Sequence, residues 1–254
     1  MVATLFPSTL IASGGLVYAF QESTMEGKII LLLLFVGSVF SWTVMVTKFR
    51  TVQRAQTQRR LFLERFRADR QPLHLYTDRT RFEGAPVFTV YKAGCKELTY
   101  QLLGSPDVDE TFRARLDSAI KISPSQMRVV ATAMERAVGE TALRLESQMI
   151  VLATAVSGAP FLGLLGTVWG VMDTFSGVAA AGSASLAAMA PGVSAALITT
   201  VLGLLVAIPA MFGYNYLLTT LRGMIIEMDN FAAELASEFE HKYVDHGDRG
   251  RTWK

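Results

Sequence analysis

Two threonines, Thr167 and Thr200, are the residues whose type and position could support chemistry in this sequence, because each lies within a long apolar segment. A hydroxyl group in such a segment needs a hydrogen-bond partner, and the backbone carbonyl four residues earlier can supply one. That explanation is sufficient for either threonine alone. Two hydroxyl groups on neighbouring helices could instead line a polar path through an apolar medium.

Other patterns that could mark a reactive site are weaker. Three glycines have a spacing like that of a nucleotide-binding loop, but they lie inside an apolar run and no soluble strand precedes them. They are Gly163, Gly166 and Gly170. His241 and His246 are expected to be solvated residues of the carboxyl end and not metal ligands. We therefore expect no enzyme activity, no metal site and no cofactor.

The composition indicates a membrane protein. Of the 254 residues, 51% are hydrophobic and only 18% are charged, whereas soluble domains have about 25% charged residues. The formal net charge of +2 argues against binding of nucleic acid, which requires a basic face. The single cysteine, Cys95, excludes an intramolecular disulfide framework and a multi-cysteine metal cluster.

Uncharged segments predict three membrane-spanning helices. Residues 29–47 and 149–172 contain no Asp, Glu, Lys or Arg, and 174–221 is also uncharged. The last segment is about twice the ~20 residues that cross a ~30 Å hydrocarbon core. However, residues 179–185 are small and polar, and Pro191 and Gly192 follow them. We therefore predict an outer hairpin over 173–188 and a third span over 189–218.

The distribution of basic residues predicts the orientation. The segment 48–148 holds 18 of the 24 Lys and Arg residues, whereas 1–28 holds one and 173–188 holds none. Because Lys and Arg are retained on the cytoplasmic side, 48–148 and 219–254 should be cytoplasmic. The amino-terminal segment 1–28 should be periplasmic. Its first twenty residues are expected to lie at the membrane interface, with a cleaved signal peptide as the alternative.

The cytoplasmic parts have helical apolar stripes. Residues 56–66 extend the first span as a basic amphipathic helix, and 87–102 and 225–239 have apolar residues at three- and four-residue spacing. A further helix should begin at Ser123-Pro124, since serine is a good cap and proline is tolerated in the first turn. We expect this helix to continue into 149–172 without a break, and the stripes to pack as a helical bundle.

Small residues are concentrated on one face of the second span and one face of the third. These faces comprise Ala159, Gly163, Gly166, Thr167 and Gly170, and Val193, Ala196, Thr200, Gly203 and Ala207. Small faces let helices approach closely in lipid, so we expect the glycines and alanines, together with Pro160, to join helices or subunits or to face a partner. None of the three spans contains an ionisable side chain, although proton relays usually need one. A titrating group would therefore have to come from another chain.

Two sequence blocks resemble the signature of the ExbB/TolQ family, relatives of the flagellar stator MotA. One is Ala159-Pro160-Phe-Leu-Gly-Leu-Leu-Gly-Thr-Val-Trp-Gly-Val-Met172. The other is Ala190-Pro-Gly-Val-Ser-Ala-Ala-Leu-Ile-Thr-Thr-Val-Leu-Gly-Leu-Leu-Val-Ala-Ile-Pro-Ala210, followed by Tyr214-Asn215. The resemblance is strong over 125–243 and weaker over 27–122. It agrees with the order and orientation of the spans predicted above.

The resemblance implies an all-α, ring-forming oligomer, a pentamer, in the bacterial inner membrane. The ring would surround two copies of a single-span, ExbD- or TolR-like partner that carries a membrane Asp, and a TonB- or TolA-like protein would be a third component. Thr167 and Thr200 match the two pore threonines of the family. Ala195 stands where family members commonly have Glu, which leaves the role of that Glu open here.

The function implied is use of the proton motive force to drive work at the outer membrane or cell wall, as in biopolymer transport. The rival hypothesis is a non-conducting membrane scaffold that recruits a partner through its small-residue helix faces. The sequence does not determine which process is energised, or whether the ion is H⁺ or Na⁺. The absence of carboxylates in the spans argues against a sodium site built by this chain alone.

Overall fold

The computed structural model describes residues 24–68, 71–78, 80–106, 108, 111–182 and 185–245. The regular structure in these ranges is helical, and besides the helices they contain one isolated parallel β-bridge, between Ile122 and Val244. The interface segment expected over the first twenty residues lies outside the described ranges, as do His246 and the tail beyond it.

Three helices of the described chain are long and apolar enough to cross a membrane. They are α2 (Met25–Ala68), α7 (Met149–Ala181) and α8 (Leu186–Tyr243). The prediction of an all-α membrane protein with three spans is confirmed, as is the helical continuation of the first and third spans beyond the apolar segments. By their internal contacts the residues form two units, divided after Thr47, Ser147 and Tyr216.

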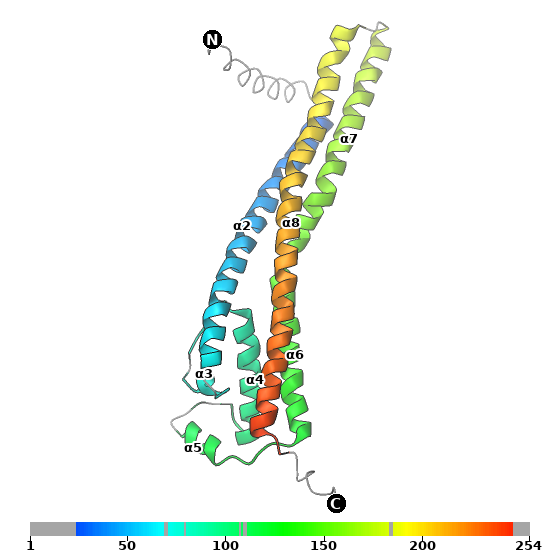
Figure 1. Cartoon of the computed structure of the whole chain (residues 1–254). Coiled ribbons are helices and arrows are strands. Elements are labelled where there is room, and N and C mark those ends of the chain that lie inside the picture. The colour runs from blue at the N-terminus through cyan, green and yellow to red at the C-terminus, as the bar shows by residue number, and fades with distance from the viewer. Residues whose placement is uncertain are drawn as a thin grey trace, which may run out of the picture. The chain divides into compact units, whose positions relative to one another are not determined.

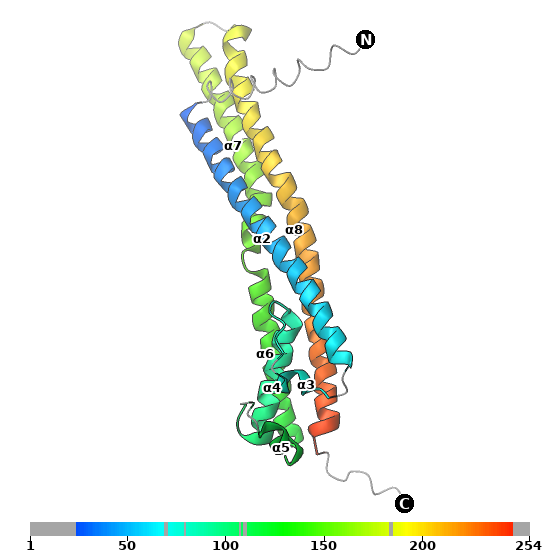
Figure 2. The same ribbon diagram turned by 90° about the vertical axis from the view of Figure 1, so that its left-hand side faces the viewer.

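The first unit consists of the apolar parts of α2, α7 and α8, which run side by side in both views (Figures 1 and 2). Its small apolar core joins all three helices and contains Ile30, Leu34, Ala159 and Ala207. Helix α7 continues to Ala181 and ends at Gly182, whose φ of 65° is left-handed. The outer connection is therefore shorter than predicted, because residues 173–181 extend the helix.

The second unit contains the charged parts of the chain and has a large apolar core. Its helices include α3 (His74–Thr77), α4 (Pro86–Leu103), α5 (Phe112–Asp117) and α6 (Pro124–Glu146). Phe62 of α2 is fully buried, and its ring contacts those of Phe66, Phe82, Phe88, Tyr91 and Phe231. The predicted stripes thus pack into one helical bundle.

Local signals explain where the bundle helices begin and end. Ser123 caps α6: its Oγ accepts the Gln126 N–H, and the Gln126 side chain accepts the Ser123 N–H at 2.9 Å. Gly104 ends α4 with a φ of 74°, a left-handed conformation that suits glycine. The start of α6 at Ser123-Pro124 agrees with the sequence expectation.

Tyr91 and Cys95 of α4 are completely buried in this bundle. The Tyr91 hydroxyl donates to the Pro72 carbonyl at 2.8 Å and accepts the Tyr76 N–H at 3.0 Å. Burial raises the pKa of the Tyr91 phenol, and it likewise raises the pKa of the Cys95 thiol. Both groups are therefore neutral at pH 7. Through its two hydrogen bonds, Tyr91 stabilises the connection between α2 and α4.

The predicted continuous helix from Ser123-Pro124 into the second span is wrong. Helix α6 ends at Glu146, and α7 begins at Met149 after Gln148, whose φ of 67° is left-handed. The break is stabilised by Lys48, whose Nζ donates to the Leu145 carbonyl at 3.0 Å and contacts Ser147 Oγ at 3.4 Å. Because this cap comes from a residue about 100 positions earlier, no local Gly or Pro marks the break.

Candidate functional site

Helices α7 and α8 approach each other backbone to backbone along their predicted small faces. A Cβ atom placed on Gly163 would lie 2.9 Å from the Thr199 carbonyl oxygen, and one on Gly203 would lie 2.6 Å from the Ala159 carbonyl oxygen. A Cβ on Gly170 would be 2.8 Å from that of Ala196. These distances leave no room for a side chain, so the glycines bring the two helices into contact.

The remaining small residues of the predicted faces support the same contact. Ala159, Ala196 and Ala207 are buried, as are Gly163 and Gly166, which α7 presents to α8. Pro160, which was also predicted to face a helix or a partner, lies inside α7 and is partly exposed. The structure thus brings the predicted packing residues together within one chain, and their part in contacts between subunits stays a prediction.

The structure also brings Thr167 of α7 and Thr200 of α8 together. Their hydroxyl groups are directly hydrogen-bonded, and either oxygen can be the donor. Thr167 Oγ1 is also 3.2 Å from the carbonyls of Gly163 and Ala196, and Thr200 Oγ1 is 3.0 Å from the carbonyl of Gly163. Both side chains remain partly exposed. The pair therefore has internal partners and yet is accessible at the helix surface.

A third threonine, Thr199, lies beside this pair and was not predicted from the sequence. It is 1% exposed, and its Oγ1 lies 3.0 Å from the Gly163 carbonyl and 2.7 Å from the Ala196 carbonyl. Helical periodicity selected Thr200 because it lies nearly in phase with Ala196. The Thr-Thr pair itself was the available signal, because each hydroxyl in an apolar span needs a hydrogen-bond partner. We call Thr167, Thr199 and Thr200 the threonine cluster.

Ala195 lies beside this cluster, on the side of α8 that meets the beginning of α2. It is 4% exposed and lines a cavity of about 20 Å³ together with Thr24 and Gly27. Gly166, Gly170, Gly192, Ala196 and Thr199 complete the lining. Position 195, where members of the resembled family commonly have Glu, is therefore part of a tightly packed contact among three helices in this chain.

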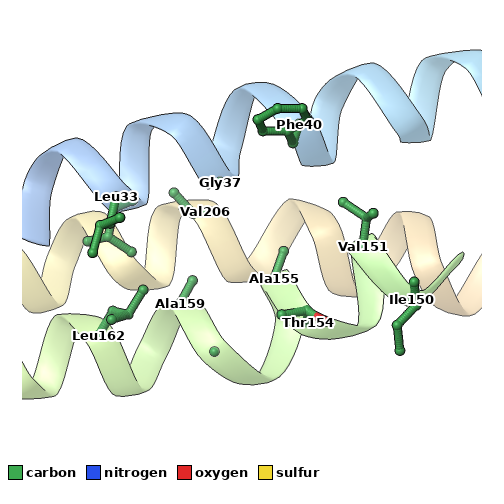
Figure 3. Close-up of a pocket in the computed structure, with 12 residues that line it drawn as sticks. Leu33, Gly37, Phe40, Ile150, Val151, Thr154, Ala155, Ala159, Leu162 and Val206 are labelled. Carbon is green, nitrogen blue, oxygen red and sulfur yellow. The ribbon is translucent and has the colours of Figure 1, made fainter. Parts of the chain in front are cut away.

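A separate apolar groove of about 360 Å³ lies between α2, α7 and α8 (Figure 3). Leu33, Gly37 and Phe40 line it from α2, and Val206 lines it from α8. Thr154 of α7 is its one residue with a polar side chain. The groove and the threonine cluster have no lining residue in common, so the groove adds no polar group to the cluster.

Ionisable groups do not gather near the threonine cluster. Between Ile29 and Thr47, Met149 and Met172, and Met189 and Leu218, the chain has no Asp, Glu, Lys, Arg or His. Among the described residues, no group of three or more His, Cys, Asp or Glu side chains is placed to hold a metal ion. The cluster can donate, accept and relay hydrogen bonds, but it cannot itself take up a proton near neutral pH.

The fold and this cluster define a class: a multi-pass α-helical membrane protein with a closely packed pair of spans that carries hydroxyl groups. Residues 106–230 match the model of the MotA/TolQ/ExbB proton channel family. The Tol-Pal system protein TolQ of Pseudomonas aeruginosa is 32% identical over 197 residues, which is 77% of this chain and 79% of that protein. The chain belongs to the MotA/TolQ/ExbB proton channel family.

Two further relatives support this assignment. TolQ of Haemophilus influenzae is 31% identical over 86% of this chain and 90% of its own length. The biopolymer transport protein ExbB of Xanthomonas campestris pv. campestris is 41% identical over 129 residues, about half of each chain. The resemblance to ExbB and TolQ proposed from the sequence is thereby confirmed.

Proposed function

We propose that this chain is the ring-forming, proton-conducting subunit of an inner-membrane motor and not an enzyme. Its partner is a single-span, ExbD- or TolR-like protein, and the ring is a pentamer with the amino termini in the periplasm and the carboxyl termini in the cytoplasm. Membership of a proton channel family supports the conducting role. The excess of Lys and Arg in 48–148 supports the orientation.

The pairing of Thr167 with Thr200 is the observation that carries this proposal. Two spans place hydroxyl groups in contact inside segments that contain no ionisable side chain. Such a pair can pass a proton to or from a carboxylate but cannot titrate itself. The proposal therefore requires a membrane carboxylate from the partner, which the ring would surround with small and hydroxyl side chains.

The physics of that carboxylate provides a way to couple proton flow to motion. A charged carboxylate among Ala, Gly and Thr side chains lacks the solvation that water gives it, so it is stable there only when protonated or hydrogen-bonded. Its neutral and charged forms then favour different positions in the ring. Each proton that crosses supplies about 2.3 kcal/mol per 100 mV of membrane potential, which can rotate ring against core.

The work done by this motor is expected at the outer membrane or in the cell envelope. The names of the relatives, a Tol-Pal system protein and a biopolymer transport protein, support these two processes about equally. A TonB- or TolA-like third component would carry the motion outward.

The first experiment is to co-express this chain with the product of the neighbouring gene and to analyse the purified complex by native mass spectrometry. We expect five copies of this chain with two copies of a protein whose single apolar span contains an Asp. Reconstitution of that complex in liposomes should give proton uptake driven by membrane potential. A stable oligomer that retains no such partner and conducts no protons would overturn the proposal.

The rival function, a non-conducting scaffold, is favoured by one observation: every hydroxyl of the threonine cluster has a partner within this chain. In a scaffold the cluster would only hold α7 against α8. The two functions differ in their response to an uncoupler. A motor loses its cellular activity when the proton motive force is dissipated, whereas a scaffold keeps it.

A further inference from the structure

One backbone oxygen, that of Gly163, is approached by three hydroxyl groups. Oγ1 of Thr199 and Oγ1 of Thr200 each lie 3.0 Å from it, and Oγ1 of Thr167 lies 3.2 Å from it. A carbonyl oxygen has two lone pairs, and within a helix one of them accepts the N–H four residues later. Three hydroxyl protons therefore compete for one remaining acceptor position.

The competition is resolved by two alternative acceptors. The Ala196 carbonyl lies 2.7 Å from Thr199 Oγ1 and 3.2 Å from Thr167 Oγ1. The Thr167–Thr200 hydrogen bond provides the second, because either oxygen can accept. Each hydroxyl has a single proton, so the choice made by one threonine limits the choices of the other two.

Three complete arrangements satisfy all three donors. In the first, Thr199 donates to the Gly163 carbonyl, Thr200 donates to Thr167, and Thr167 donates to the Ala196 carbonyl. In the second, Thr200 donates to the Gly163 carbonyl, Thr167 donates to Thr200, and Thr199 donates to the Ala196 carbonyl. In the third, Thr199 donates to the Ala196 carbonyl, Thr200 donates to Thr167, and Thr167 donates to the Gly163 carbonyl. Thr167 can therefore donate to Thr200 only while Thr199 donates to the Ala196 carbonyl, and Thr200 is the donor whenever Thr199 donates to the Gly163 carbonyl.

We propose that Thr199 is a positioning residue of the proton path, which makes Thr200 the donor in the Thr167–Thr200 hydrogen bond whenever Thr199 itself donates to the Gly163 carbonyl. This role rests on the proposed function. Thr199 is 1% exposed, whereas Thr167 and Thr200 are partly exposed, so Thr199 acts through its neighbours and not on a partner's carboxylate. When Thr200 releases the Gly163 carbonyl to donate to that carboxylate, Thr199 takes over the vacated lone pair.

Gly166 holds Thr199 in the position that this role needs. A Cβ at residue 166 would lie 2.5 Å from Thr199 Oγ1 and 2.7 Å from Thr199 Cβ. Because Gly166 has no side chain, the buried side chain of Thr199 has room at this position. A threonine hydroxyl that simply stabilised its own helix would need only the Ala196 carbonyl, whereas this one also reaches the Gly163 carbonyl of α7.

The test compares proton flux through the complex of this chain with its partner in liposomes. Thr199→Val removes the hydroxyl but keeps the shape of the side chain, and Thr199→Ser keeps the hydroxyl. Thr43→Val is the matched control, because Thr43 is exposed on α2 and its hydroxyl donates to the Val39 carbonyl of the same helix. Native mass spectrometry of each variant reports whether the complex assembles.

We expect Thr199→Val to slow the proton flux by a factor of about 5 or more, because the proton path through the threonine cluster then lacks one hydrogen bond. Thr199→Ser and Thr43→Val should conduct as the unchanged chain does. Wild-type flux in Thr199→Val, or equal loss in Thr199→Ser, would overturn the inference. If Thr199→Val does not assemble, Thr199→Ser and Thr199→Cys are compared, since they have similar shapes and the thiol is a weak donor. Equal proton flux in Thr199→Ser and Thr199→Cys would likewise overturn the inference.

Thr167→Val and Thr200→Val separate this inference from the proposed function. If both slow the flux and Thr199→Val does not, the positioning role of Thr199 is wrong and the proton path stands. If neither of them nor Thr199→Val slows it, the path through the threonine cluster is wrong, and the role of Thr199 falls with it.

Discussion

Lys48 Nζ donates a hydrogen bond to the backbone carbonyl of Leu145 at 3.0 Å, although the two residues are 97 positions apart. The lysine is 7% exposed and lies just after the apolar part of α2. It occupies the place at which the last carbonyls of α6 lack helical partners, and a cation there also interacts favourably with the helix dipole. A long-range side-chain contact therefore fixes the end of α6.

Replacing Lys48 should weaken this helix end. We expect Lys48→Met, which keeps the apolar stem, to destabilise the protein by about 1–3 kcal/mol, the usual effect of removing a charged donor from a partly buried carbonyl. The measurement is the thermal unfolding midpoint in detergent. Lys96→Met, at an exposed position of α4, is the control and should unfold like the unchanged chain. Equal midpoints for all three chains would show that the cap contributes nothing.

Replacing Gln148 with glycine should stabilise the folded protein. Its φ of 67° costs a side-chain-bearing residue about 1–2 kcal/mol, and glycine adopts this conformation without that cost. Gln148→Gly is therefore expected to raise the unfolding midpoint, and Gln148→Val to lower it, because β-branched residues tolerate positive φ least. If the break were an ordinary stretch of helix, glycine would instead lower the midpoint.

The contact between α7 and α8 should not tolerate even a methyl group. Gly163→Ala and Gly203→Ala place a Cβ within 2.9 Å and 2.6 Å of backbone oxygens. Each should disrupt assembly, which size-exclusion chromatography and cross-linking would report. Gly177→Ala is the matched control on α7, because no atom lies within 4 Å of a Cβ there. Normal assembly of Gly163→Ala would mean that the two helices lie further apart.

Energised function should depend on both partly exposed threonines. Thr167→Val and Thr200→Val are each expected to reduce proton flux by roughly tenfold, since loss of about 1.4 kcal/mol at the limiting step changes a rate by that factor. Both variants should assemble, because valine has nearly the shape of threonine. Normal outer-membrane-dependent growth of a strain carrying both valines would contradict the assignment.

Cys95 should not react with thiol reagents in the folded protein. Its side chain is fully buried, and burial raises the pKa of the thiol, so the reactive thiolate is scarce at pH 7 and remains scarce as the pH is raised to 9. We expect alkylation by iodoacetamide only after unfolding by denaturant. Rapid labelling of the native protein at pH 7 would show that α4 opens readily from the bundle.

Much of this fold follows from patterns local in the sequence. The uncharged segments gave the spans, and the stripes containing Phe62, Tyr91 and Phe231 correctly indicated the core of the second unit. Both depend on periodicity, because a helix that must bury one face repeats apolar residues on that face. Helical phase also placed Thr167 and Thr200 on the small faces of α7 and α8, whereas their direct hydrogen bond was found only in the structure.

The features that the sequence did not reveal depend on contacts between distant residues. The break before Gln148 is stabilised by Lys48, and the outer connection is short because α7 continues past its predicted end, where Thr174 packs against Gly192 of α8. Thr199 was missed because its burial depends on the space above Gly166, which only the docked helices define. Pattern alone could not supply these three relationships.

The short outer connection also bears on biogenesis. Only four residues separate Ala181 from Leu186, and the glycine contacts between α7 and α8 involve no third segment. The two helices can therefore enter the bilayer as a hairpin and pair there as soon as both are synthesised. The threonine cluster would then be formed within each newly made chain, before any ring is assembled.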